Sequence, residues 1–298
     1  MNLIHVKGNT YYLEGKSAVP VYAQEDGSCV LIDSGWPMEK QKIFDALEEK
    51  HLSPAAVLLT HMHIDHSGNC LTLRERFGAE IVMPVEEAGL ACSMENLRIM
   101  YSYLSRKEMR LSGIMPLSAI AADRLICPED SRISIGSVEF SIIHTPGHSS
   151  GHVCIVTPDD VVCTGDAVMG KELLKKARIP RHQDPGEALD SLKKFEHDHR
   201  QAILAHGGLY PDLSRIAAYN GRIISESLEM IRNLIEEGMT EEDIAVRAEQ
   251  ELGLRSGRLL LAKLNHSLIS RYLHTLTESG QVRAYVKDGK ICYSRQLR

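Results

Sequence analysis

The segment from residue 60 to residue 68, Thr-His-Met-His-Ile-Asp-His-Ser-Gly, constrains this 298-residue chain more than any other feature. A short apolar run that predicts a β-strand comes directly before it, so its polar side chains enter a loop at the carboxyl end of a strand. Because His61 and His63 are two residues apart, an extended backbone directs both imidazoles to the same side. Asp65 and His66 then begin a helix. Four side chains of metal-binding types within six positions predict a metal site.

Three further candidate ligands each stand directly after a predicted strand. They are His148 in Thr-Pro-Gly-His, Asp166 in Thr-Gly-Asp and His206 in Ala-His-Gly-Gly. The small residues beside them let the backbone turn sharply where each strand ends. A sheet whose strands deliver their ligands to one rim would gather them all in a single site. The alternative, a set of unrelated histidines, would require several independent coincidences.

Strand and helix patterns alternate up to about residue 215, which predicts two sheets faced by outer helices. Residues 85–125 interrupt this alternation. Their Met- and Tyr-rich stretch, 94–115, predicts a helical insertion with an adaptable apolar face. Two roles are open for it: helices packed on the core or on a partner subunit, or a lid that shapes a substrate pocket.

The pattern from residue 216 onward is helix-rich and ends in two strand-like runs around an Asp-Gly turn. It predicts a small winged-helix-like domain over 216–298. Residues 221–252 carry 3 basic and 9 acidic side chains, whereas 253–298 carry 9 basic and 2 acidic ones. The basic half is either a surface for nucleic acid or a solvated or self-associating face, the latter compatible with a homodimer.

The composition, 43% hydrophobic and 25% charged with a net charge of -6, is typical of a globular protein. No run approaches the roughly 20 apolar residues of a membrane span, and the first residues lack the basic flank and apolar core of a signal peptide. The seven cysteines are scattered without a Cys-x-x-Cys pair, which indicates reduced thiols. We therefore expect a cytoplasmic protein that has no membrane partner.

The ligand motifs resemble those of the metallo-β-lactamase fold hydrolases over roughly residues 1–215, and they occur in that family's order. The resemblance implies an α+β fold, a four-layer αββα sandwich forming a catalytic domain over 1–215. It also implies two divalent metal ions. Imidazole-rich ligation suits zinc, and iron or manganese is an alternative. The implied ligands are His61, His63 and His148 on one metal and Asp65, His66 and His206 on the other, with Asp166 bridging.

Two carboxylates are the candidate catalytic residues. They are Asp65 and Asp33, and Asp33 in Leu-Ile-Asp-Ser-Gly matches the family residue that steadies the ligand loop. With two divalent cations, five neutral imidazoles and two carboxylates, the site stays positively charged. Such a site favours a bound hydroxide, which would attack a carbonyl or a phosphorus atom.

Several other residues are predicted either to contact the substrate or to have a purely structural role. His152 is either a structural residue or a substrate contact, and Tyr210 either donates to a developing oxyanion or packs in the fold. Basic residues after the bridging aspartate either line a pocket for an anionic substrate or belong to a solvated surface. They are Lys171, Arg178, Arg181 and His182.

The leading prediction is a hydrolase of a small-molecule ester, thioester or lactone, because an apolar lid suits a compact and partly apolar ligand. The main alternative is an endoribonuclease or phosphodiesterase acting on single-stranded RNA, since the lactamase-like-protein-2 type of endoribonuclease is similar in its domain order. The basic half of the tail would then hold the RNA. Glyoxalase II shares all seven ligands, but the basic and Tyr residues of its glutathione-binding tail have no match here. A metal-binding regulatory module without turnover is the third possibility.

Overall fold

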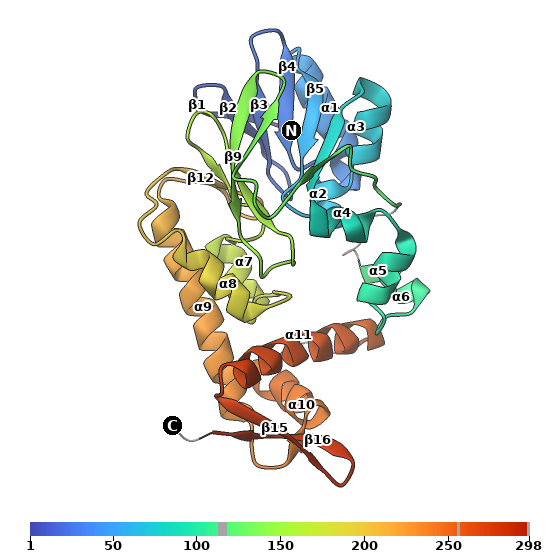
Figure 1. Cartoon of the computed structure of the whole chain (residues 1–298), viewed down its shortest axis with the longest axis vertical. Helices are drawn as coiled ribbons and strands as arrows, with labels where there is room; N and C mark the ends of the chain where they lie inside the picture. The colour runs from blue at the N-terminus through green and yellow to red at the C-terminus, as the bar shows by residue number, and fades with distance from the viewer. Residues whose placement is uncertain (113–117, 255–256, 297–298) are drawn as a thin grey trace.

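Two mixed β-sheets pack face to face, helices cover both outer faces, and a helical C-terminal part extends from one end of the sandwich (Figure 1). The computed structural model describes residues 1–112, 118–254 and 257–296, with the side chains of Arg110 and Ser112 left aside. The predicted αββα sandwich is confirmed. It forms because each sheet is apolar on both faces and must be covered twice.

The first sheet has seven strands in sequence order. They are β1 (Leu3–Lys7), β2 (Thr10–Leu13), β3 (Val19–Ala23), β4 (Ser28–Ile32), β5 (Ser53–Leu58), β6 (Glu80–Pro84) and β7 (Arg124–Ile126). Along β4, Cys29 and Leu31 face the outer helices, whereas Val30 and Ile32 face the other sheet. Strands β4, β5 and β6 are parallel, so their carboxyl ends meet at one edge. The outer helices after β4 and β5 are η1 (Pro37–Glu39), α1 (Lys40–Glu49), α2 (Ile64–Ser67) and α3 (Cys70–Phe77).

The second sheet has six strands in the order β13-β12-β11-β10-β9-β8. They are β8 (Arg132–Ile135), β9 (Val138–His144), β10 (Val153–Val156), β11 (Val162–Cys163), β12 (Ala202–Leu204) and β13 (Gly208–Tyr210). Because β11 is parallel to β12 and both β9 and β11 are antiparallel to β10, strands β9, β11 and β12 all run the same way. The loops after them therefore leave the sheet at one edge. Helices α7 (Lys171–Ala177) and α8 (Pro185–Lys193) lie between β11 and β12.

Three short helices form the predicted insertion after β6. They are α4 (Val85–Ala91), α5 (Met94–Met100) and α6 (Arg106–Ser112). Leu97, Tyr101 and Leu104 are buried in the same core cluster as α1 and α3, so the insertion packs on the sandwich. Residues 113–117 of the predicted insertion, including Met115, lie outside the described residues.

The C-terminal part begins within a single long helix, α9 (Leu213–Leu234), which covers the second sheet and then continues beyond it (Figure 1). The predicted domain boundary at 215–216 falls inside α9, and the division into two domains stays a prediction. The elements that follow are β14 (Met239–Thr240), α10 (Glu241–Leu252), α11 (Leu259–Glu278), β15 (Val282–Lys287) and β16 (Lys290–Arg295). The three strands form a small sheet in the order β14-β16-β15. The winged-helix assignment stays a prediction.

Helix α11 connects the C-terminal part to both sides of the sandwich (Figure 1). Near its start, Leu264 joins the core cluster of the insertion, and Lys263 forms an ion pair with Glu108 at 2.9 Å. Farther along, the fully buried Tyr272 donates a hydrogen bond from its hydroxyl to the carbonyl of Pro180 at 2.8 Å. Helix α11 therefore lies across this end of the sandwich, between the insertion and α8 (Figure 1).

Within the described ranges, no helix combines the length and the apolar character needed to cross a lipid bilayer. Localisation in the cytoplasm stays a prediction.

Candidate metal centre

Three imidazoles converge at the edge where the two sheets deliver their loops. His61 Nε2 lies 2.9 Å from His63 Nδ1, and His148 Nε2 lies 3.0 Å from the same His63 atom. Burial lowers the pKa of His61 and that of His148 well below the usual range, so both rings stay neutral. When each ring carries its proton on the other nitrogen, three lone pairs face one another at this distance, and they repel unless they share a cation. The arrangement fits one divalent metal ion bound by three histidines.

A second group of ligands lies beside the first. His206 Nε2 is 3.0 Å from Asp65 Oδ2, and His66 Nε2 is 3.5 Å from the same oxygen. Ligand atoms of these three residues all lie within 4.8 Å of one another. Two imidazoles and a carboxylate are a donor set suited to a second divalent ion.

Asp166 lies between the two groups. Its Oδ2 is 3.3 Å from His148 Nε2, and its Oδ1 is 3.4 Å from both His66 Nε2 and His206 Nε2. In the part of the chain that the structure describes, His66 Nε2 and Asp166 Oδ1 are buried without a hydrogen-bond partner. Buried polar atoms without partners are rare, and two metal ions would satisfy both of these. The structure thus brings together all seven predicted ligands, in the two predicted groups.

Charge coupling within the cluster also favours cations. Burial raises the pKa of Asp65, but the charge of His66 and the hydrogen bond from His206 outweigh it and hold the pKa low. Burial likewise opposes a charged His66, yet the carboxylates of Asp65, Asp33 and Asp166 raise its pKa well above the usual range. The carboxylates of this cluster therefore favour a cation among them, and metal binding competes there with protons.

Asp33 forms hydrogen bonds that orient His66, a member of the second ligand group. Its Oδ1 accepts a hydrogen bond from the Thr60 amide at 2.8 Å, and its Oδ2 accepts one from His66 Nδ1 at 2.8 Å. The bond to Nδ1 directs Nε2 of His66 toward Asp65 and Asp166. Asp33 is itself buried and has a φ of 65°, a left-handed conformation that aspartate tolerates. It is therefore a positioning residue.

The non-ligating nitrogens of three other rings also have partners. His61 Nδ1 donates to Thr60 Oγ1 at 3.0 Å, and His206 Nδ1 donates to the carbonyl of Lys16 at 3.3 Å. His63 Nε2 lies 3.5 Å from the hydroxyl oxygen of Tyr101. Each contact fixes the orientation of a ring and the position of its proton.

His152, predicted as either a structural residue or a substrate contact, is buried against the loop of Asp166. Its Nε2 accepts a hydrogen bond from the Asp166 amide at 3.1 Å, and its Nδ1 donates to Thr145 Oγ1 at 2.8 Å. Burial lowers the pKa of His152 to about 3, so it stays neutral. Gly165 precedes Asp166 with a φ of 49°, and a Cβ there would meet Thr60 Oγ1 at 2.6 Å. Only glycine fits this turn without displacing a neighbour.

Glu87 was not predicted, although it connects the two ligand loops. This fully buried carboxylate lies on α4, where its Oε2 accepts from the Met62 amide and its Oε1 from the Gly151 amide, each at 3.0 Å. One bond holds the loop of His61 and His63, and the other holds the loop of His148. In the sequence, Glu87 is one of two acidic residues in the first turn of a helix, which is an ordinary helix-start pattern.

Replacing Glu87 by Gln should loosen the metal centre. A glutamine can accept only one of the two amide hydrogen bonds, and its NH2 group would face the other amide. An unsatisfied buried group costs about 1–3 kcal/mol in the free energy of unfolding, and we expect metal affinity to fall roughly tenfold. Urea unfolding and titration with a chelator measure the two effects. The exposed neighbour change Glu86→Gln is the control, and equal behaviour of both variants would contradict the assigned role.

A pocket of 220 Å³ opens on the ligands His63, Asp65 and His148. Its walls come from four segments that are distant in sequence. They are Trp36; Met100, Tyr101 and Tyr103 of the insertion; Arg181, His182 and Gln183; and Leu264, Ser267, Leu268 and Arg271 of α11. Arg181 and His182 were among the predicted pocket residues. The four α11 residues were not predicted, although three of them lie three, four and seven positions after Leu264, so all four share one face of a helix.

Three other predicted contacts lie elsewhere. Tyr210, on β13, packs against the outer core cluster of the second sheet, and Lys171 Nζ lies 5.3 Å from the ring centre of Tyr219. Arg178 follows α7 and approaches Gly253. As far as the described residues show, none of the three lines the pocket at the metal ligands.

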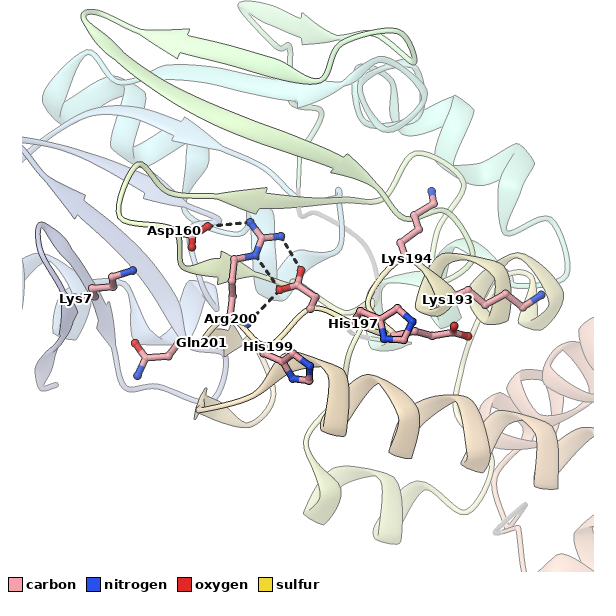
Figure 2. Close-up of a pocket in the computed structure, with 10 residues that line it drawn as sticks. Lys7, Asp160, Lys193, Lys194, His197, His199, Arg200 and Gln201 are labelled. Carbon is pink, nitrogen blue, oxygen red and sulfur yellow. Dashed lines mark hydrogen bonds and ion pairs between the residues drawn. The ribbon is translucent and has the colours of Figure 1, made fainter.

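A larger cavity of 740 Å³ contains none of the predicted ligands (Figure 2). Its basic lining is partly neutralised, because Arg200 forms ion pairs with Asp198 at 2.6 Å and Asp160 at 3.1 Å. Lys193 pairs with Asp190 at 2.6 Å. The smaller pocket opens on three of the predicted ligands, so it is the candidate site.

Known proteins share a family model, sequence similarity and a fold with this chain. Residues 13–205 match the model of the metallo-beta-lactamase superfamily. The chain is 28% identical to the hydroxyacylglutathione hydrolase GloC of Haemophilus influenzae and 31% identical to the probable metallo-hydrolase YqgX of Bacillus subtilis. Each alignment covers 48% of this chain, and 63% and 62% of the two relatives, respectively. The chain thus spans less than two thirds of their length.

Solved structures share the fold over nearly the whole chain. A metallo-beta-lactamase family protein of Thermus thermophilus superposes with a TM-score of 0.71 at 19% identity, covering 97% of this chain and 99% of that one. A beta-lactamase domain protein of Burkholderia ambifaria gives 0.70 at 18% identity, covering 99% and 94%. The C-terminal helices and sheet are therefore part of an architecture found in other proteins.

Proposed function

The chain belongs to the metallo-beta-lactamase superfamily, and from this premise we propose that it hydrolyses a small ester, thioester or lactone at a dinuclear metal centre. The observation that carries the proposal is the convergence of seven ligand side chains beneath a 220 Å³ pocket. An apolar cavity of about 150 Å³ holds a benzene molecule, and sites for drug-sized ligands start at about 300 Å³. The part of the substrate that reaches the ligands is therefore small.

The proposed metal-binding residues are the two histidine-rich groups, joined by Asp166. Zinc is the proposed metal, since imidazole and carboxylate ligands in these numbers suit it. When bound, the ions supply Lewis acidity and lower the pKa of a coordinated water to about 7.

The protein's own groups orient the centre and receive the substrate. Asp33 fixes the ring of His66, His152 fixes the backbone of Asp166, and Trp36 and Leu268 form walls that exclude water. Burial raises the pKa of Tyr101, so its hydroxyl keeps its proton at neutral pH. Because His63 Nε2 can donate to the oxygen of that hydroxyl, the hydroxyl proton remains available for an oxygen of the substrate.

A thioester is the favoured substrate among the three. GloC is a hydroxyacylglutathione hydrolase, and hydroxyacylglutathione is a thioester. The similarity covers about half of this chain, so the acyl group and the thiol of the substrate are open to experiment.

Turnover of a small panel tests the proposal. Metal-replete protein should hydrolyse at least one of S-lactoylglutathione, S-acetyl-N-acetylcysteamine and a homoserine lactone, as measured by the release of thiol or acid. A chelator should abolish the activity and added zinc should restore it, because the proposed chemistry requires metal ions bound by these side chains. Activity that survives the chelator would contradict the metal-dependent mechanism, and absence of turnover with every member would contradict thioester and lactone hydrolysis.

The same metal-replete protein also tests RNA cleavage and the predicted homodimer. Single-stranded RNA, labelled at one end, reports on the phosphodiesterase alternative, for which the basic residues of the C-terminal part are the supporting feature. Metal-dependent RNA cleavage without thioester turnover would favour that alternative. Light scattering measures the mass in solution and tests the predicted homodimer.

A further inference from the structure

Two cavities lie next to each other along α11. The inner one is the 220 Å³ pocket at the metal ligands, and the outer one measures 570 Å³ and lies against α11 and α5. The side chains that line both are Met100, Tyr103, Ser267 and Arg271. Because the cavities share these walls, one elongated ligand can occupy both. The inner cavity admits only a small part of it, and the outer cavity has room for the remainder.

Arg271 stands at this junction with its donors unused. Its side chain is half-buried, and within the described ranges its guanidinium makes no hydrogen bond or ion pair. Lys263, two turns earlier on the same helix, is by contrast paired with Glu108. A guanidinium offers five N–H donors, and partial burial without acceptors is unfavourable. Its donors are thus available to a ligand in either cavity.

The positive charge around Arg271 is not balanced by nearby carboxylates of the described residues. Arg181 lines the inner cavity, and among the described residues its acceptors are neutral: the carbonyl of Leu264 at 3.2 Å and Asn265 Oδ1 at 3.3 Å. Burial lowers the pKa of Arg181, and the charge of Arg271 adds to that effect while Tyr103 opposes it. Arg181 and Arg271 both line the inner cavity, so their positive charges add there.

The acidic side chains that line the two cavities, among the described residues, are Asp65 and Glu241. Asp65 faces His206 within the metal centre, and Glu241 accepts a hydrogen bond from Ser270 Oγ at 3.1 Å. Neither pairs with an arginine. The junction of the cavities is consequently a place where an anion is favoured.

We propose that Arg271 binds an anionic group of the substrate, a carboxylate or a phosphate, at the junction of the two cavities. The acyl group then reaches the metal ligands in the inner cavity, and the anionic part extends into the outer one. Arg181 adds a second positive charge beside it. This inference rests on the proposed function for the identity of the reacting bond, but anion binding at Arg271 does not require turnover.

Matched acid and amide probes test the proposal by binding. 3-(Methylthio)propionate and its amide carry no thiol and no thioester, so isothermal titration of the metal-loaded protein measures affinity alone. We expect the acid to bind about ten- to a hundredfold more tightly than the amide through Arg271, as charge-assisted hydrogen bonds predict. Arg271→Gln should lose this preference and Arg271→Lys should keep part of it. Arg283→Gln, on the exposed hairpin, is the matched control and should retain it all.

Turnover distinguishes the source of the anion. S-Acetyl-3-mercaptopropionate is compared with its amide for a carboxylate, and S-acetylphosphopantetheine with S-acetylpantetheine for a phosphate. Arg271→Gln should lower kcat/KM about ten- to a hundredfold for the anionic member of the favoured pair and by a much smaller factor for the neutral member. An acid preference that persists in Arg271→Gln, or its absence in the wild type with both pairs, overturns the proposal. Arg271-dependent binding without any hydrolysis supports the anion site and contradicts the proposed function.

Discussion

Replacing Asp166 by Ala should lower kcat/KM by about a thousandfold or more and reduce the metal content of the protein. Asp166 is the residue whose two oxygens face both ligand groups, at 3.3 Å from His148 and 3.4 Å from His66 and His206. Without it, each group keeps only three side chains, and the two cations would repel each other with no anion between them. Metal ions contribute several kcal/mol to catalysis of this kind, and each 1.36 kcal/mol is a factor of ten in rate.

The measurement combines metal analysis with kinetics. Metal per chain is determined by mass spectrometry after dialysis, and kcat/KM is determined with the best thioester of the panel. Asp190→Ala is the control, because this exposed carboxylate pairs only with Lys193 on the surface of α8, as far as the described residues show. Two metals per chain together with full activity in Asp166→Ala would show that Asp166 does not bridge.

Replacing Asp33 by Asn should weaken metal binding about 10- to 100-fold while the fold is kept. The buried carboxylate accepts a hydrogen bond from His66 Nδ1, which leaves Nε2 of that ring facing the second metal group. An asparagine can keep the bond to the Thr60 amide, but its NH2 group would then face His66. The ring would accept through Nδ1 and carry its proton on Nε2, the nitrogen required for the metal. Asparagine also tolerates the left-handed φ of 65° at this position.

Competition with a chelator measures the metal affinity of Asp33→Asn, and thermal unfolding of the metal-free protein measures the stability. Asp45→Asn, on the exposed side of α1, is the control. Unchanged metal affinity in Asp33→Asn would contradict the tautomer argument, whereas a large loss of stability without a change in metal affinity would make Asp33 a residue of the fold alone.

The ligand set is predictable from the sequence because every ligand follows a strand. Parallel strands carry the loops of Asp33 and His61 to one edge, and β9, β11 and β12 do the same for His148, Asp166 and His206. Successive apolar side chains of β4 point to opposite faces: Cys29 and Leu31 face the helices, and Val30 and Ile32 face the other sheet. A strand that is apolar on both faces indicates a sheet covered on both sides. These features depend on local periodicity, which a sequence displays directly.

The pocket walls are not predictable in the same way. The sequence leaves two roles open for Tyr210, which is near His206 along the chain; β13 pairs with β12 and packs this tyrosine against the outer cluster, as the second role predicts. Tyr101 lies nearer the ligands in space, 38 residues from the His63 that it contacts. Arg271 and Glu87 belong to helices whose patterns show amphipathicity and nothing more. Which face of a helix meets a pocket depends on tertiary packing, and no local signal encodes it.

The groups proposed to bind metal and one wall of the substrate pocket come from separate parts of the chain. All seven proposed metal ligands lie between residues 61 and 206, whereas a wall of the pocket comes from residues 264–271 of α11. Substitutions on that helix face can therefore alter which molecules are admitted without touching the groups that bind metal. A lineage carrying this architecture can diversify its substrates by changing one helix, and an engineer can graft a different α11 face onto an unchanged reaction centre.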